Sequence, residues 1–173
     1  RMPSGNKSRT RVAYLFPGQG AQSVGMGSEL YKKSAPARSV FDMADEVLGF
    51  SLSRLCFDGP EDELQQTVNT QPAIFTVSLA VLAAFEESLS KNTQLDPELM
   101  AGHSLGEYTA LVAAKSMDFA TGLRLVRERG RLMQDAGFRR EGAMGAVLGL
   151  DELTTEEICR ETGAQIANLN SDD

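Results

Sequence analysis

One short stretch, residues 102–106 with the sequence GHSLG, restricts the fold of this chain more than any other. It matches the G-x-S-x-G pattern of a nucleophile elbow, in which a serine lies on a sharp turn between a strand and a helix. The context fits, because apolar residues 99–101 precede the motif and good helix formers fill residues 105–114. The pattern predicts that Ser104 is a nucleophile at a helix N-terminus, which stabilises negative charge. An ordinary glycine-flanked turn is the alternative interpretation.

A second glycine-rich turn, residues 17–20 with the sequence PGQG, ends a predicted strand over residues 11–16. A loop of this kind can bring backbone N–H groups close to a ligand. It lacks the lysine and the following hydroxyl residue of a phosphate-binding P-loop. A tight turn without a ligand is the other interpretation that these residues allow.

Helical patterns fill most of the remaining first part of the chain. Helices are expected at residues 35–48, 52–57, 61–67, 73–90 and 119–136. Ser34 and Asp118 are expected N-caps, and Gly49 ends the first of these helices. The helix over residues 73–90 is apolar almost all round as far as Phe85, which predicts burial inside a sizeable core. No apolar run looks long and uninterrupted enough to span a bilayer.

One arginine falls on the apolar side of the last of these helices. On a helical wheel, the side that looks solvated holds Arg124, Arg127, Glu128, Arg131 and Asp135, and the apolar side holds Leu123, Leu125, Val126, Leu132 and Met133. Arg129 falls near the middle of the apolar side, where a guanidinium needs a partner. A buried acid such as Glu107 is one candidate, and a ligand carboxylate held by both arms of the guanidinium is the other. Gly130 would let another backbone approach closely.

The C-terminal residues change character. Residues 142–149 and 165–170 have strand patterns, and a helix between them starts with a capping-box sequence at Thr154 and ends at Glu161. Such a β-α-β segment cannot bury both of its faces alone, so it is expected to begin a small appended subdomain. The predicted domains are a disordered leader at residues 1–10, an incomplete α/β core at residues 11–138 and the truncated subdomain at residues 139–173.

Composition narrows the function classes. The chain has 173 residues, 42% of them hydrophobic, and a formal net charge of −7, which fits a globular domain and argues against a nucleic-acid surface. Its first residues lack the apolar core of a secretory signal. Cys56 and Cys159 share no metal-ligand spacing, so reduced thiols, no metal site and a cytoplasmic location are expected.

Four motifs occur in the order and spacing of one family: FPGQG at residues 16–20, TQPA at 70–73, GHSLGEY at 102–108 and RGRLMQ at 129–134. On these motifs the chain resembles malonyl-CoA:acyl carrier protein transacylase of type II fatty acid synthesis, from about Arg11 to the last residue. Acyltransferase domains of polyketide synthases and type I fatty acid synthases share much of this set. The resemblance implies an α/β fold, namely an α/β-hydrolase-like core with a parallel sheet that carries a ferredoxin-like subdomain.

The resemblance also implies a role for each motif. Ser104 would take the malonyl group from coenzyme A, and the backbone N–H groups of Gln19 and Leu105 would form the oxyanion hole. Arg129 would hold the malonyl carboxylate, and Gln71 is similar to a glutamine near the family's active site. The implied partners are acyl carrier protein and a coenzyme A thioester, with no cofactor, nucleic acid or membrane.

His103 marks a departure from the family, whose general base is a histidine well downstream of the serine. The single histidine of this sequence directly precedes Ser104. Neighbouring residues on a tight turn project apart, so His103 is expected to make a structural or polar contact at the pocket floor rather than to accept the serine proton. The chain is therefore expected to be the N-terminal part of a longer enzyme.

Two other function classes stay open, a non-catalytic module that binds carrier protein and a serine hydrolase of related fold. Arg129 favours an anionic acyl group over a neutral ester. Leu105 after the serine resembles the malonyl type, although the family's other positions that separate malonyl from methylmalonyl lie outside this sequence. A mitochondrial or plastid location would require the removal of a transit peptide.

Overall fold

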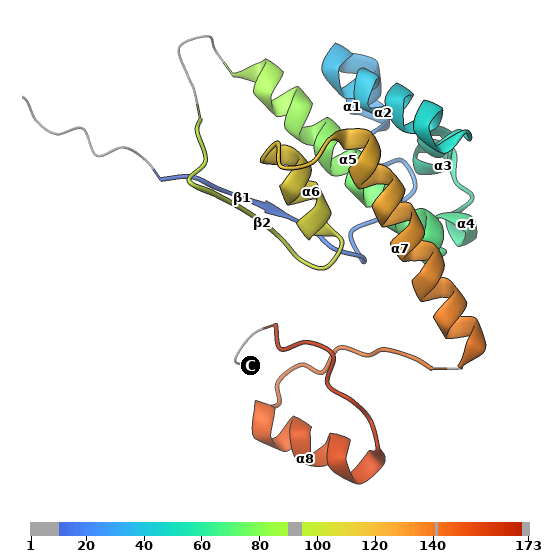
Figure 1. Cartoon of the computed structure of the whole chain (residues 1–173), viewed down its shortest axis with the longest axis vertical. Coiled ribbons are helices and arrows are strands. Elements are labelled where there is room, and N and C mark those ends of the chain that lie inside the picture. Colours follow the sequence, from blue (N-terminus) through green and yellow to red (C-terminus); the bar gives the residue numbers. More distant parts are fainter. Residues whose placement is uncertain (1–10, 90–94, 141, 171–173) are drawn as a thin grey trace, which may run out of the picture. The chain divides into compact units, whose positions relative to one another are not determined.

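The computed structural model describes residues 11–89, 95–140 and 142–170. The leader expected at residues 1–10 lies outside the described residues. The chain divides into two compact units, Arg1–Arg139 and Arg140–Asp173. The first unit contains the buried core and is a mixed α/β structure with a small parallel sheet, which confirms the expected α/β class (Figure 1).

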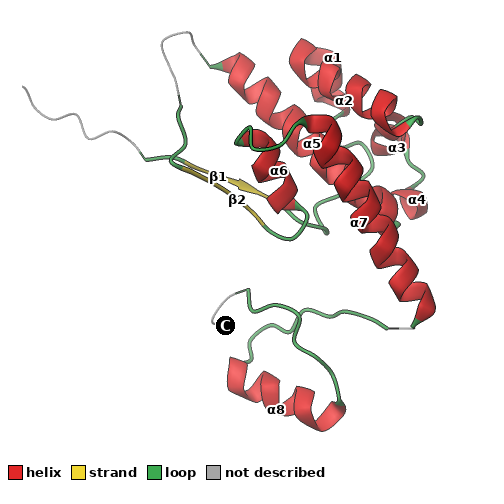
Figure 2. Cartoon of the chain, in the orientation of Figure 1, coloured by secondary structure: helices red, strands yellow, loops and turns green. Residues whose placement is uncertain are grey.

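Helices form most of the first unit (Figure 2). Its elements are β1 (Ala13–Phe16), α1 (Ser28–Lys33), α2 (Ala35–Leu48), α3 (Leu52–Asp58), α4 (Glu61–Gln65), α5 (Thr67–Ser88), β2 (Leu99–Gly102), α6 (Gly106–Ala113) and α7 (Phe119–Arg139). The predicted caps of α2 are confirmed, because the Ser34 hydroxyl accepts the Ala37 N–H at 3.2 Å and Gly49 ends the helix in the left-handed conformation. Asp118 likewise accepts the Thr121 N–H at 2.9 Å at the start of α7.

The sheet brings two distant turns together. Strands β1 and β2 pair in parallel, with Ala13 opposite Leu99 and Phe16 opposite Gly102. Parallel strands end at the same edge of a sheet, so the PGQG loop after β1 and the elbow after β2 are neighbours. Helix α6 packs against both strands, while Leu15 and Leu99 on the alternate positions are 76% and 54% exposed.

Helix α5 is the centre of the first unit and packs against α2, α6 and α7 (Figure 1). It begins at Thr67, before Pro72 rather than after it as predicted. Proline is preferred in the first turn of a helix, which misled the prediction, whereas here the preceding turns are held by side chains. The Thr70 hydroxyl donates to the Leu64 carbonyl at 2.6 Å, and the Asn69 amide donates to the Glu63 carbonyl at 2.8 Å.

Burial of α5 is confined to part of its length. Residues 70–76 are buried, but Val81 and Phe85 near the other end are 47% and 40% exposed, which corrects the expectation of burial as far as Phe85. Contrary to the sequence-based expectation, α5 is also long and apolar enough to cross a bilayer by length and mean hydropathy. Half of its most apolar window is buried inside the protein, and core helices of globular domains also meet this test of length and hydropathy.

The wheel assignment of α7 is correct for some residues and wrong for others. Its buried residues are Gly122, Leu123, Val126 and Gly130, and three of them, Gly122, Val126 and Gly130, follow one another at spacings of four. A Cβ atom on Gly130 would lie 2.7 Å from the Thr67 carbonyl oxygen, which confirms the predicted close approach of another backbone. Because this contact fixes the orientation of the helix, Leu125, Leu132 and Met133 are exposed, and Arg127 is half-buried instead of solvated.

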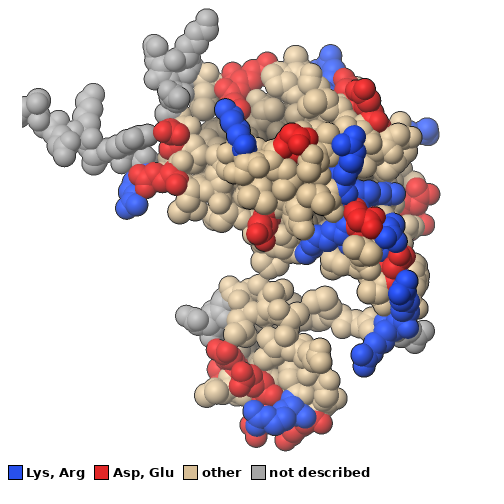
Figure 3. Space-filling view, in the orientation of Figure 1, with Lys and Arg blue, Asp and Glu red and all other residues tan. Residues whose placement is uncertain are grey.

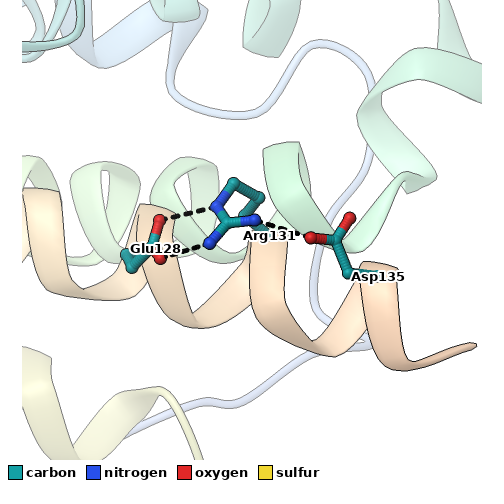
Figure 4. A network of polar contacts seen from close by, with 3 residues as sticks. All are labelled: Glu128, Arg131 and Asp135. Carbon is teal, nitrogen blue, oxygen red and sulfur yellow. Dashed lines mark hydrogen bonds and ion pairs between the residues drawn. The ribbon is translucent and has the colours of Figure 1, made fainter.

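The solvated side of α7 carries a small ionic network (Figure 4). Arg131 forms ion pairs at 2.6 Å with Glu128 and with Asp135, one turn before and one turn after it. Hydrogen bonds from Arg131 lower the pKa of the Glu128 carboxyl, and those bonds raise the pKa of Arg131 in turn. These three residues confirm the predicted polar side of the helix.

Among its described residues, the second unit contains one helix, α8 (Glu152–Thr162). It begins before Thr154 because Asp151 is the N-cap and accepts the Thr154 N–H at 2.9 Å. The strands predicted at residues 142–149 and 165–170 are wrong, since the described residues of this unit form no strand. Their apolar side chains stay in solvent, with Met144 79% and Leu148 84% exposed, and a strand needs a ladder partner for its backbone groups.

Candidate active site

Ser104 lies on the sharp turn that the motif predicted. Strand β2 ends at Gly102 and α6 begins at Gly106, so Ser104 lies between a strand and a helix N-terminus. Its backbone φ is +55°, a left-handed conformation that is uncommon for a residue other than glycine. A serine in such a conformation has a local energetic cost, and costs of this kind are concentrated at functional sites.

The two flanking glycines are required by contacts. A Cβ atom on Gly102 would collide with the carbonyl group of Gly106, and a Cβ atom on Gly106 would lie 2.5 Å from the Phe16 carbonyl oxygen. The first contact closes the turn on itself, and the second places the elbow against the end of β1. The elbow interpretation of the motif therefore fits this geometry better than an ordinary turn does.

The loop after β1 lies directly against the elbow. The His103 N–H donates to the Phe16 carbonyl at 3.1 Å, and a Cβ atom on Gly18 would lie 2.8 Å from His103 Nδ1. Within the described part of the chain, the backbone N–H groups of Gln19 and Leu105 donate to no protein acceptor. Free backbone amides of this kind are what an oxyanion hole requires.

Arg129 reaches the elbow from α7. Its Nη2 donates to the Ser104 hydroxyl oxygen at 2.9 Å, and its Nη1 donates to the Gln71 side-chain carbonyl at 2.7 Å. Among the described residues Arg129 forms no ion pair, so the interpretation as a buried salt bridge to Glu107 is wrong. A guanidinium whose protein partners are neutral keeps a full positive charge for a ligand anion.

Gln71 and Met133 support this arginine. Gln71 on α5 is fully buried, and its amide nitrogen donates to the Met133 sulfur at 3.2 Å while its oxygen accepts from Arg129. Arg129 and Met133 are one turn apart on α7, so they hold the same side chain from two positions. The family resemblance implied that Gln71 lies near the site. The sequence analysis missed Met133, although its position one helical turn after Arg129 was the available signal.

The other features considered as possible sites are a buried cysteine, a metal site and a cavity. Burial raises the pKa of Cys56 to about 12, which keeps it a thiol and a poor nucleophile. No group of His, Cys, Asp and Glu suited to a metal ion occurs among the described residues. A cavity of about 400 Å³ lies elsewhere in the first unit, and none of the predicted site residues lines it.

Acidic and basic side chains are interspersed on the face drawn in Figure 3.

The chain is similar to known proteins over most of its length. The acyl transferase domain family matches residues 13–172. The chain is 46% identical over 166 residues to a malonyl CoA-acyl carrier protein transacylase of Bacillus subtilis, covering 93% of this chain and 51% of the relative. A solved malonyl CoA-acyl carrier protein transacylase from Coxiella burnetii is 42% identical, with a TM-score of 0.84 over 93% of this chain and 51% of that one.

A third similar protein was solved with a partner. It is a malonyl-transacylase in complex with a type II polyketide synthase acyl-carrier protein, 40% identical with a TM-score of 0.76, and the match covers 88% of this chain and 48% of that one. The chain thus spans about half the length of the relatives that it matches. With the family match over nearly all of its residues, and with a GxSxG elbow, a glycine-rich loop and an unpaired arginine around one serine, the chain belongs to the acyl transferase domain family.

Proposed function

We propose that this chain carries the nucleophile and the carboxylate-binding arginine of a malonyl-CoA:acyl carrier protein transacylase. The observation that carries the proposal is the contact between Arg129 Nη2 and Ser104 Oγ at 2.9 Å. In one bound ligand, a carboxylate held by Arg129 would be separated by only a few covalent bonds from a carbonyl carbon that Ser104 attacks. A malonyl thioester, with one methylene between these two groups, has the matching length.

The proposed reaction has two steps. Ser104 Oγ attacks the thioester carbonyl of malonyl-CoA, the carbon–sulfur bond breaks, and the serine proton ends on the coenzyme A thiol. The phosphopantetheine thiol of acyl carrier protein then attacks the seryl ester, and the thiol proton returns to Ser104. In both steps the backbone N–H groups of Gln19 and Leu105 stabilise the oxyanion. Neither step transfers electrons to an acceptor, so the reaction needs no cofactor.

Arg129 and Gln71 provide the selectivity in this proposal. A charge-assisted, bidentate pair between Arg129 and a carboxylate favours malonyl over acetyl thioesters. Buried Gln71 keeps the guanidinium beside Ser104 through its 2.7 Å hydrogen bond. His103 contributes a structural contact against the PGQG loop, and the family's histidine base has no counterpart in these 173 residues.

The finer architecture and setting follow the same proposal. The first unit is the nucleophile-bearing part of an α/β-hydrolase-like core, and residues 140–173 begin a ferredoxin-like subdomain. The partners are acyl carrier protein and a coenzyme A thioester in a cytoplasmic compartment, and the free cysteines Cys56 and Cys159 support such a compartment. Similarity to a type II polyketide malonyl-transacylase makes a polyketide pathway the second candidate function.

The proposal predicts a covalent acyl-enzyme on Ser104. Brief exposure of the intact gene product to malonyl-CoA should add one malonyl group by intact mass, and Ser104→Ala should abolish the adduct. Subsequent addition of acyl carrier protein should remove the adduct from the wild-type protein. A malonyl adduct that persists in Ser104→Ala would refute the assignment, and an adduct that carrier protein cannot remove would favour hydrolase chemistry.

A further inference from the structure

The crossing of α5 and α7 contains a second arginine whose contacts the proposed function does not use. Arg127 Nη1 donates to the Val68 carbonyl at 2.7 Å and to the Asn69 side-chain oxygen at 2.6 Å. The guanidinium also lies over the Phe50 ring, 4.9 Å from its centroid. Its described partners are neutral, so an ion pair does not account for a half-buried cation at this place.

Pro72 explains why the Val68 carbonyl needs a donor from outside its helix. In an α-helix that carbonyl would accept from the N–H four residues later, and at that position α5 has Pro72, which has no N–H. A helix carbonyl without its usual donor loses a hydrogen bond, and the Arg127 guanidinium supplies one to Val68. The N–H of the same residue, Val68, donates to Gln134 Oε1 at 3.2 Å.

These bonds lie where the backbones of the two helices touch. A Cβ atom on Gly130 would lie 2.9 Å from the Val68 Cα atom, so the backbones are in contact there. Arg127 and Gln134 then bond to both polar groups of Val68, while Arg129 and Met133 bond to Gln71, one turn further along α5. A slide of α5 along α7 would break both sets of bonds together.

We infer that Arg127 is a positioning residue: by bonding to the carbonyl that Pro72 leaves open, it fixes α5 on α7 and thereby holds Gln71 and the Arg129 guanidinium at Ser104. Arg127 touches neither Ser104 nor Gln71, so it acts through the position of α5. The expected effect on binding of malonyl-CoA rests on the proposed function. The expected effect on how tightly the Arg129 side chain is held does not rest on that function.

The test combines Arg127→Met with Pro72→Ala. Arg127→Met should increase the rotation rate of the Arg129 guanidinium, measured by ¹⁵N NMR, and raise KM for malonyl-CoA about tenfold with little change in kcat. Pro72→Ala gives the Val68 carbonyl a helical donor, so adding it to Arg127→Met should restore most of both values. Arg127→Lys keeps one donor and should stay close to wild type.

Arg124→Met is the matched control, because Arg124 is exposed on the same helix and has no hydrogen bond among the described residues. The inference is overturned if Arg127→Met leaves Arg129 rotation as slow as Arg124→Met does. It is also overturned if Arg127→Met only lowers stability, or if Pro72→Ala restores nothing. Should the wild-type protein transfer no malonyl group, the proposed function fails while the NMR comparison still decides this inference.

Discussion

Two regions of α7 place arginines in opposite surroundings. Arg131 is half-exposed on the solvated side and lies between two acids on its own helix, Glu128 and Asp135 (Figure 4). Arg129 faces α5 and bonds only to the neutral groups of Gln71 and Ser104 among the described residues. Acids already neutralise the first guanidinium, whereas the second keeps its charge for a ligand. The partners of an arginine, more than its burial, thus indicate whether it serves structure or binding.

The largest expected effect separates these two arginines directly. Arg129→Met should lower kcat/KM for malonyl transfer by about 10²-fold or more, because a charge-assisted pair with the acyl carboxylate is lost. Arg131→Met, the matched control, should stay within about twofold, since its ion pairs lie on the surface. Steady-state kinetics with malonyl-CoA and acetyl-CoA measure both. Equal losses for the two thioesters in Arg129→Met would assign that arginine a structural role.

A smaller effect is expected from changing the helix contact itself. Gly130→Ala would force a Cβ atom to within 2.7 Å of the Thr67 carbonyl oxygen and should lower the free energy of unfolding by about 1–3 kcal/mol. It should also separate Arg129 from Gln71 and leave the Arg131 network intact, because that network lies within α7.

Gly137→Ala is the control on the same helix, because a Cβ atom there meets nothing within 4 Å. It should raise the free energy of unfolding by up to about 1 kcal/mol, since alanine favours the helix over glycine. Urea denaturation of the two variants measures the difference. A gain in stability from both alanines would show that the α5–α7 contact is looser than described.

The smallest effect concerns the pH dependence of the exposed network. Hydrogen bonds from Arg131 lower the pKa of Glu128, so at a given pH this carboxyl group binds fewer protons in the folded state than in the unfolded state. Its stabilisation is present above the unfolded pKa of about 4.3 and is lost as the pH falls through the folded value. NMR titration should show the Glu128 pKa rising towards its ordinary value in Arg131→Met, with no change in Arg129→Met. An unchanged Glu128 titration in Arg131→Met would contradict the network.

Local signals in the sequence predicted the elbow, the α2 caps and the position of Arg129 on the apolar side of its helix. Each depends on residues close together in the chain, such as the glycines around Ser104 or Ser34 before a helix. Local signals could not predict the contacts of Arg129, because Gln71 and Met133 come together only where α5 crosses α7. The row of buried residues at Gly122, Val126 and Gly130 sets that crossing, whereas the wheel weighted large apolar residues instead.

The errors in the second unit have a different origin. Residues 142–149 contain apolar residues in a pattern typical of a strand, yet a strand exists only where another strand completes its hydrogen bonds. The described residues of this unit offer no such strand, and α8 has no buried residue. Its start was misplaced because both Asp151 and Thr154 are good capping residues, and the geometry selects the aspartate.

The thioether that supports Gln71 has a consequence for sample handling. Met133 is 44% exposed, and conversion of its thioether to the sulfoxide would add an oxygen and a dipole where the Gln71 amide now bonds. Such oxidation is expected to disturb the Gln71 contact with Arg129 while Ser104 stays chemically intact. Mass spectrometry would record this damage as a gain of one oxygen atom, and methionine sulfoxide reductase would reverse it.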